Sequence, residues 1–171
     1  MSNADCASGV CTGLPTSCPF AVCSIRACAA PTLNGGDTCA NAPDVTDGGI
    51  FGGSTSTATD DYAPAVGTCG TAGSSPGRDV AYAITSTTTT DYTVTVTPVR
   101  FPALLDAVLY AQLACGSDTC LAGATSDRGA ATSITFTAPA GQTVFVIVDG
   151  QGSSDGQFEI SIQSAANDAG P

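Results

Sequence analysis

The second half of the chain alternates between apolar and polar residues with a period of two. In residues 91–99, Tyr92, Val94 and Val96 fall on one side of an extended backbone and threonines fall on the other. Because successive side chains of a β-strand point to opposite faces, this pattern predicts a strand with one buried and one wet face. The same alternation occurs in three further segments: 79–85, 132–139 and 156–163.

Other apolar segments complete a set of short strands. Residues 143–150, "TVFVIVDG", are apolar on both faces, which predicts a central strand. A further strand is predicted over residues 106–114, and a weaker one around residue 50. Strands of this spacing, separated by Gly, Ser and Asp and without a competing helical pattern, predict an all-β fold. We expect an antiparallel, jelly-roll-like β-sandwich of about seven or eight strands.

The N-terminal segment differs in composition and in hydrophobic pattern. Residues 5–36 carry five cysteines and almost no apolar periodicity, so crosslinks have to replace a core there. Residues 1–4 look like a remnant of an expression vector, and a stretch with Pro and Gly before residue 37 marks a linker. We therefore expect a Cys-rich stalk at 5–36, a separable sandwich at 37–165 and a disordered tail at 166–171.

The charge of the chain is sparse and one-sided. It has four arginines, no lysine and fifteen acidic residues, which give a net charge of −11. Such a surface repels nucleic acid and anionic lipid, because it offers few cations to replace their counterions. The longest apolar runs are much shorter than a membrane span. The sequence therefore argues against nucleic acid as a partner, and it leaves cations, neutral polymers and other proteins as options.

Cysteine is unusually frequent, with nine residues in 171. No histidine is present and no two cysteines have the CxxC spacing, so a zinc site is not expected. Disulfides in an oxidising compartment explain the count, which predicts an extracellular or cell-envelope location. Because nine is odd, either one thiol is unpaired or its partner lies upstream of this sequence. A signal peptide or a lipoprotein anchor upstream is also compatible with the sequence. The candidate disulfide residues are Cys6, Cys11, Cys18, Cys23, Cys28, Cys39, Cys69, Cys115 and Cys120.

Catalytic chemistry has few candidates in this sequence. Without histidine or lysine, the chain cannot build a Ser-His-Asp, Cys-His or Ser-Lys site, nor a Schiff base. The only glutamate, Glu159, falls on the wet face of its strand, and the aspartates fall in loops and at strand ends. We therefore expect that the chain is not an enzyme and that it has no catalytic residue. A carboxylate-based hydrolase is the least favoured alternative.

Two groups of aspartates are candidate calcium ligands. Asp149 and Asp155 flank a Gly- and Ser-rich hairpin loop, and Asp60 and Asp61 are neighbours in the chain. Calcium takes about six to eight oxygen ligands, chiefly from carboxylates and carbonyls, so both groups offer suitable atoms. Asp-Gly is also an ordinary turn signal, so the same aspartates have a simpler interpretation as turn formers, with no cofactor.

One tyrosine is a candidate for contact with a ligand. Tyr62 follows two aspartates in a loop and is expected at the surface, whereas Tyr82, Tyr92 and Tyr110 fall on or near core-facing positions. An exposed ring can stack on a sugar, but a loop tyrosine also serves as a packing cap. Both interpretations stay open at this stage.

Several segments, in their order along the chain, resemble the bacterial pre-peptidase C-terminal domains. The match runs over residues 36–163 through "DTCANAPDV", "DDYAPAVGTCG", "GRDVAYAIT", "LLDAVLYAQLACGSDTC" and "AGQTVFVIVDGQGSSDGQFEISI". The resemblance implies a β-sandwich of the kind found beside secreted peptidases and in large cell-surface proteins. It also implies two disulfides that close the domain, Cys39–Cys69 and Cys115–Cys120.

The opening segment "DCASGVCTG" is similar to Cys-rich repeats in envelope proteins of myxobacteria-like bacteria. This likeness implies a stiff stalk that holds the sandwich away from a cell surface. We therefore expect a non-catalytic accessory or display module of a secreted or cell-surface bacterial protein, with other domains of that protein as partners. The alternative is a module that binds a glycan or an extracellular protein with the help of calcium.

Overall fold

The structure, a computed structural model, describes residues 30–70, 77–99, 105–126 and 129–165. The predictions for the vector remnant, the five N-terminal cysteines and the C-terminal tail lie outside these residues. The described chain forms a short 3-10 helix, η2 (Cys39–Asn41), and eight strands. The strands are β1 (Gly49–Ser54), β2 (Val80–Thr85), β3 (Thr90–Pro98), β4 (Ala107–Gln112), β5 (Ala122–Thr125), β6 (Thr132–Ala138), β7 (Thr143–Gly150) and β8 (Gln157–Ser164).

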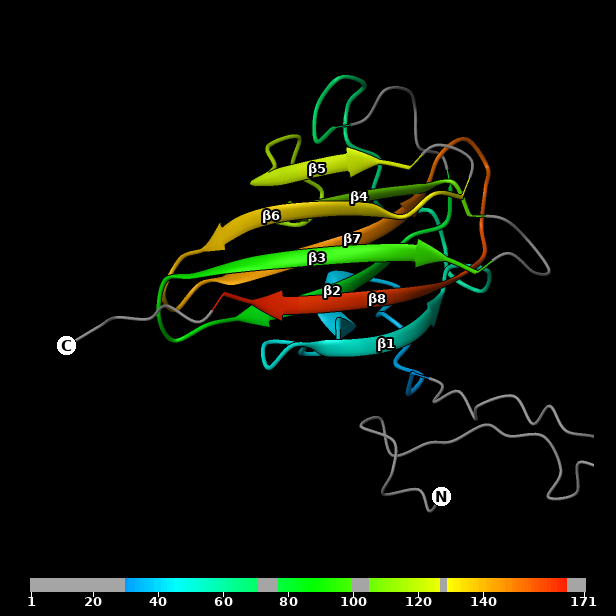
Figure 1. Ribbon diagram of the computed structural model, residues 1–171. Coiled ribbons are helices and arrows are strands. Elements are labelled where there is room, and N and C mark those ends of the chain that lie inside the picture. The colour runs from blue at the N-terminus through cyan, green and yellow to red at the C-terminus, as the bar shows by residue number, and fades with distance from the viewer. Residues whose placement is uncertain (1–29, 71–76, 100–104, 127–128, 166–171) are drawn as a thin grey trace, which may run out of the picture.

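The strands form two four-stranded antiparallel sheets that pack face to face (Figure 1). Sheet 1 has the order β1-β8-β3-β6, and sheet 2 has the order β2-β7-β4-β5. The pairs β1 with β8, β2 with β7, β3 with β6 and β4 with β5 are those of one long hairpin wrapped around itself. This wrapping is the jelly-roll arrangement, so the predicted fold class is confirmed.

Every strand except β5 overlaps a segment that the sequence predicts. The burial of β3 and β6 alternates residue by residue, as the pattern requires. Strand β5 has the sequence Ala-Gly-Ala-Thr and is half-buried throughout, so it carries no alternation from which a strand could be predicted. Among the described residues there is no helix that is long and apolar enough to cross a membrane.

The core lies between the two sheets and is built from their inward-facing side chains. Tyr92 and Phe136 stack there with ring centroids 6.0 Å apart. Gly53 lies close to Tyr82 and Phe158, and a Cβ on it would come within 2.6 Å of the Tyr82 hydroxyl oxygen. The packing of two aromatic rings therefore requires a glycine at this position in β1.

The segment before β1 closes one side of the sandwich by pairing with both sheets. Thr32 forms a parallel bridge with Gly52 of β1, and Gly36 forms an antiparallel bridge with Ala81 of β2. The Tyr82 hydroxyl also donates a hydrogen bond of 3.1 Å to the Leu33 carbonyl. The predicted linker before residue 37 is thus hydrogen-bonded to both sheets, and the separate folding of residues 37–165 stays a prediction.

Candidate functional site

The β1–β2 loop and the β7–β8 loop begin at the same end of the sandwich, the end at which β1, β3 and β7 finish (Figure 1). The β1–β2 loop carries Asp60 and Asp61, β7 ends beside Asp149, and the β7–β8 loop carries Asp155. All four predicted calcium ligands therefore lie at the same end of the molecule. The loops are bonded to one another there, because the Ser56 hydroxyl donates to Asp155 Oδ1 at 2.9 Å.

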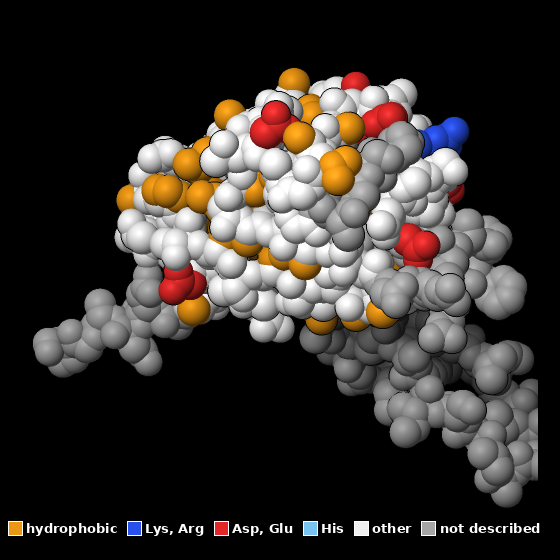
Figure 2. All heavy atoms as spheres, turned by 90° about the horizontal axis from the view of Figure 1, so that it is seen from above, with side chains coloured by type: hydrophobic (Ala, Val, Ile, Leu, Met, Phe, Trp, Pro, Cys, Tyr) orange, Lys and Arg blue, Asp and Glu red, His pale blue; other side chains and the backbone are white. Residues whose placement is uncertain are grey.

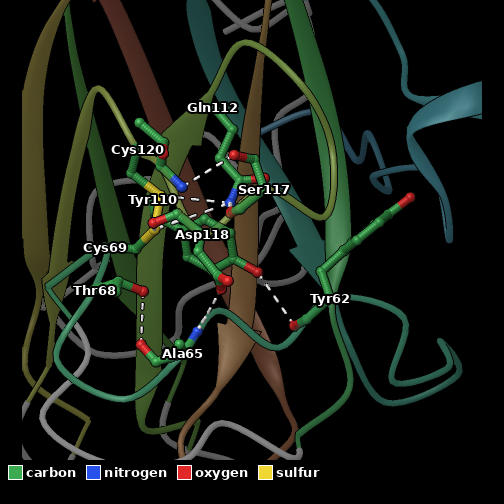
Figure 3. The surroundings of a disulfide bond; sticks show 10 residues. Tyr62, Ala65, Thr68, Cys69, Tyr110, Gln112, Ser117, Asp118 and Cys120 are labelled. Atoms are coloured by element: carbon green, nitrogen blue, oxygen red, sulfur yellow. Dashed lines mark hydrogen bonds between the residues drawn. A yellow bond between two sulfur atoms is a disulfide. The ribbon is translucent and has the colours of Figure 1, made fainter.

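The β1–β2 loop folds back over the outer face of sheet 2 and adds a third layer. Tyr62 and Cys69 from this loop pack against Val108, Tyr110 and Ile147, whose side chains leave the outer face of the sheet. Figure 3 shows Tyr62 and Tyr110 near the Cys69–Cys120 disulfide. We call this layer, formed by η2, the β1–β2 loop and the β4–β5 turn, the cover of sheet 2.

Two disulfides fasten the cover, and they join Cys39 to Cys115 and Cys69 to Cys120. The predicted pairs, Cys39–Cys69 and Cys115–Cys120, are wrong. Cys39 lies in η2, which contacts β2, whereas Cys69 lies over β5 at the opposite edge of the sheet, with its carbonyl against Gly123. Cys39 and Cys69 therefore each bond to a cysteine of the β4–β5 turn rather than to each other.

Tyr62 takes part in the cover rather than standing free at the surface. Its hydroxyl oxygen accepts a hydrogen bond of 2.8 Å from the Cys39 backbone N–H, and its carbonyl accepts one of 3.2 Å from the Tyr110 hydroxyl. Figure 3 shows the contact between Tyr62 and Tyr110. These bonds correspond to the packing role that the sequence allowed for Tyr62.

Two aspartates are completely buried beneath the cover, Asp79 and Asp149. Asp79 precedes Val80 and Asp149 follows Val148, and these two valines are partners in the antiparallel register of β2 and β7. Continued by one residue, that register brings Asp79 and Asp149 next to each other on the outer face of sheet 2. Asp79 Oδ2 accepts hydrogen bonds of 2.9 Å from the backbone N–H groups of Asp61 and Tyr62, so it anchors the β1–β2 loop. Sequence reasoning missed Asp79, although this residue opens the predicted strand 79–85.

Burial controls the ionisation of this region. Desolvation raises the pKa of Asp79 to about 7, although the two backbone N–H donors favour the charged form. Burial, together with the charges of Asp149 and Asp79, also raises the pKa of the Tyr110 hydroxyl far above its usual range. The carboxyl of Asp79 therefore keeps its proton to a higher pH than an ordinary aspartate does.

The predicted calcium ligands do not converge on one point in the described residues. Asp149 is buried, whereas Asp155 bonds to Ser56 in the loop above, and Asp60 and Asp61 are exposed. Within the described ranges no group of three or more acidic, Cys or His side chains is placed to hold a metal ion. Asp79 and Asp149 supply fewer oxygens than the six to eight that calcium takes, so a calcium ion there would need ligands beyond these two carboxylates.

Most other aspartates act as acceptors that hold loops in place. Asp37 accepts from the Thr59 backbone N–H at 2.7 Å, and Asp118 accepts from the Ala65 backbone N–H at 2.9 Å. Asp44 accepts from both the backbone N–H and the hydroxyl of Thr46, which lowers the pKa of its carboxyl. Figure 2 shows the acidic side chains on the face it draws as separate spots.

Two hollows lie beside the N-terminal segment and β1. One, of about 430 Å³, lies between residues 44–48, Phe51 and the end of β2, and it includes the carboxylates of Asp44 and Asp47. The other, of about 210 Å³, lies at the opposite end of β1 beside Thr32 and Val99, and none of its lining residues is charged. We call this second hollow the β1 groove.

Comparison with known proteins gives structural likenesses only. No family model matches the chain, and no curated protein matches its sequence. Among solved structures, the chain is similar to the pre-peptidase C-terminal domain of a collagenase from Bacillus anthracis, with 10% identity and a TM-score of 0.47 over 79% of this chain and 99% of that one.

Two further solved structures are similar to the chain at lower scores. A β-(1,4)-mannanase from Podospora anserina with a family 35 carbohydrate-binding module is 16% identical with a TM-score of 0.38, and the match spans 69% of this chain and 28% of that one. A family 35 carbohydrate-binding module from an environmental isolate is 12% identical with a TM-score of 0.35, over 70% and 93% of the two chains. The likeness is one of fold, and the fold class stands on the two antiparallel sheets themselves: the chain is a β-sandwich similar to a pre-peptidase C-terminal domain.

Proposed function

We propose that this chain is a non-catalytic accessory module of a larger secreted or surface-attached protein and that it acts by binding. The observation that carries the proposal is the use of the aspartates. Those that would have to serve as acid, base or nucleophile accept hydrogen bonds from loop backbone and hydroxyl groups instead, as Asp79, Asp118 and Asp155 do. The chemistry that remains available is recognition by a rigid surface.

Two features support a place outside the cytoplasm. The cover of sheet 2 is fastened by two disulfides that close 76- and 51-residue separations, and such bonds persist in oxidising compartments. The net charge of −11 keeps the module soluble and discourages contact with anionic polymers. A neutral polymer or another protein is therefore the class of partner that this surface admits.

Sedimentation with insoluble polymers tests the proposal. The full chain is mixed with cellulose, chitin, xylan, mannan, collagen fibres and fixed bacterial cells, and the protein that sediments with each is measured. We expect retention on at least one polymer and no release of soluble sugars or peptides. Release of soluble products at a rate that scales with protein concentration would contradict a non-catalytic role.

A second candidate is binding that depends on calcium. The observation that favours it is the buried Asp79 Oδ1, which has no hydrogen-bond partner in the described structure and lies beside a second buried carboxylate. The same sedimentation with calcium or with a chelator separates the two forms of the proposal. Retention that the chelator abolishes and that returns with calcium would favour the calcium-assisted form. Undiminished retention in the presence of the chelator would contradict that form.

A further inference from the structure

The β1 groove contains a glycine that the fold does not explain. A Cβ built on Gly52 meets no atom within 4 Å, and its φ lies outside the left-handed region. The adjacent Gly53 is different, because a Cβ there would collide with Phe158. Glycine inside a strand weakens it and often marks a place where another molecule approaches the backbone closely. Neither packing nor backbone geometry therefore requires a glycine at position 52, and the missing side chain leaves an open space.

The groove is bordered by uncharged hydrogen-bonding groups from three parts of the chain. Asn34 comes from the segment before β1, Ser54 from β1, and Gln157 from the start of β8. Asn34 and Gln157 are exposed, and each amide can both donate and accept hydrogen bonds. Val99, which is 44% exposed, adds an apolar surface. A hydroxyl-rich ligand with one apolar face matches this combination.

We propose that the β1 groove binds a short stretch of a neutral carbohydrate chain, with the ring of one sugar over Gly52 and its hydroxyls on Asn34 and Gln157. The inference rests on the proposed binding function and names its site and ligand class. Amide side chains pair well with neighbouring sugar hydroxyls, and a missing side chain lets a ring approach the strand. The C–H face of the sugar packs on Val99.

The surroundings of the groove favour neutral sugars over acidic ones. Glu159 of β8 is the cross-strand neighbour of Gly52, and its side chain is exposed on the same outer face of sheet 1. A uronic acid at Gly52 would bring a second negative charge close to this carboxylate, in a chain whose net charge is already −11. The groove should therefore discriminate against polygalacturonate-type chains.

A titration of the full chain tests the site. The neutral probes are cellohexaose, mannohexaose and xylohexaose, the acidic probe is hexagalacturonate, and a neutral peptide of Ser, Gly and Asn represents a protein ligand. Binding is followed by calorimetry and by the NMR signals of the Gly52 backbone amide and the Asn34 and Gln157 side-chain amides. We expect saturable binding of at least one neutral sugar chain with shifts centred on these three residues.

Two valine variants provide the matched comparison. Gly52→Val fills the groove at a position where the backbone and the space accept a side chain, and it should weaken binding at least about tenfold. Ser161→Val adds the same side chain to the same outer face on β8, outside the groove, and should leave the affinity unchanged. Circular dichroism and melting curves check that both variants fold.

The outcomes separate the groove from the proposed function. Equal affinity of Gly52→Val and the unchanged chain would overturn the groove assignment, as would binding of only the acidic chain, binding of only the peptide, or no binding of any neutral chain. If Gly52→Val still sediments with a polymer that the unchanged chain retains, the binding function stands and the site is elsewhere. If the unchanged chain sediments with nothing, the proposed function fails as well.

Discussion

The outer faces of the two sheets are built for different purposes. The outer face of sheet 2 is hidden beneath a cover that holds a small second core and two disulfides. The outer face of sheet 1 is open, and it displays Thr93 and Thr135 as a hydrogen-bonded cross-strand pair, with Thr95 and Ser133 beside them. The outer face of sheet 2 therefore anchors loops, whereas among the described residues no such layer lies over the outer face of sheet 1.

The burial patterns of the strands differ between the two sheets in the same way. All six residues of β4 are buried, and the last five of β7 are buried on both faces, because these strands lie beneath the cover. Strands β3 and β6 alternate because only one of their faces is covered. A strand without a polar face thus shows that its outer side is covered, even when the covering segment is distant in sequence.

Removal of the disulfides should have the largest effect on this contrast. The double variants Cys39→Ser/Cys115→Ser and Cys69→Ser/Cys120→Ser each release a long loop, which on the loop-entropy model lowers the free energy of unfolding by about 4 kcal/mol. Urea unfolding measures the loss. Ser161→Val on the open face is the control and should change stability by less than about 0.5 kcal/mol. Equal effects from the two faces would refute the contrast.

A pair of glycine variants compares the two faces directly. A Cβ on Gly123 of β5 would run into the Cys69 carbonyl of the cover, so Gly123→Val should destabilise the chain by about 2–3 kcal/mol. A Cβ on Gly52 meets nothing, so Gly52→Val should leave the stability within about 0.5 kcal/mol or raise it slightly. Thermal melts of both variants at one pH measure the difference. An unchanged melting temperature for Gly123→Val would mean that the cover is not packed closely against β5.

The buried Asp79 should make the stability of the covered face depend on pH. Because its pKa is raised from the ordinary value of 3.8 to about 7, the folded state holds the proton more tightly than the unfolded state. This contribution is present in full below about pH 4 and is lost as the pH rises through 7. Its size is on the order of 2 kcal/mol once relaxation of the loop is allowed.

Asp79→Asn isolates that contribution, because the amide oxygen can still accept from the Asp61 and Tyr62 backbone N–H groups. Urea midpoints from pH 4 to pH 8 should fall more steeply for the unchanged chain than for the variant. Parallel curves for the two proteins would show that Asp79 does not carry this pH dependence.

The strands of the sandwich could be predicted from the sequence, whereas the arrangement of the loops could not. Alternation in β3, β6 and β8 and the apolar run of β7 are local signals, so the strands could be predicted from neighbouring residues alone. The disulfide partners could not, because the positions of Cys39 and Cys69 over sheet 2 depend on the order of its strands. Asp79 was missed for the same reason: its burial comes from a loop that folds back over it.

The disulfide map is the most direct test of the cover. Cleavage of the denatured, unreduced chain before aspartates separates all four cysteines, since Asp118 lies between Cys115 and Cys120. Mass spectrometry should find peptide 37–43 joined to 106–117, and peptide 61–78 joined to 118–126. A bond between 37–43 and 61–78 would mean that the loop is closed on itself, which would contradict a cover fastened to the β4–β5 turn.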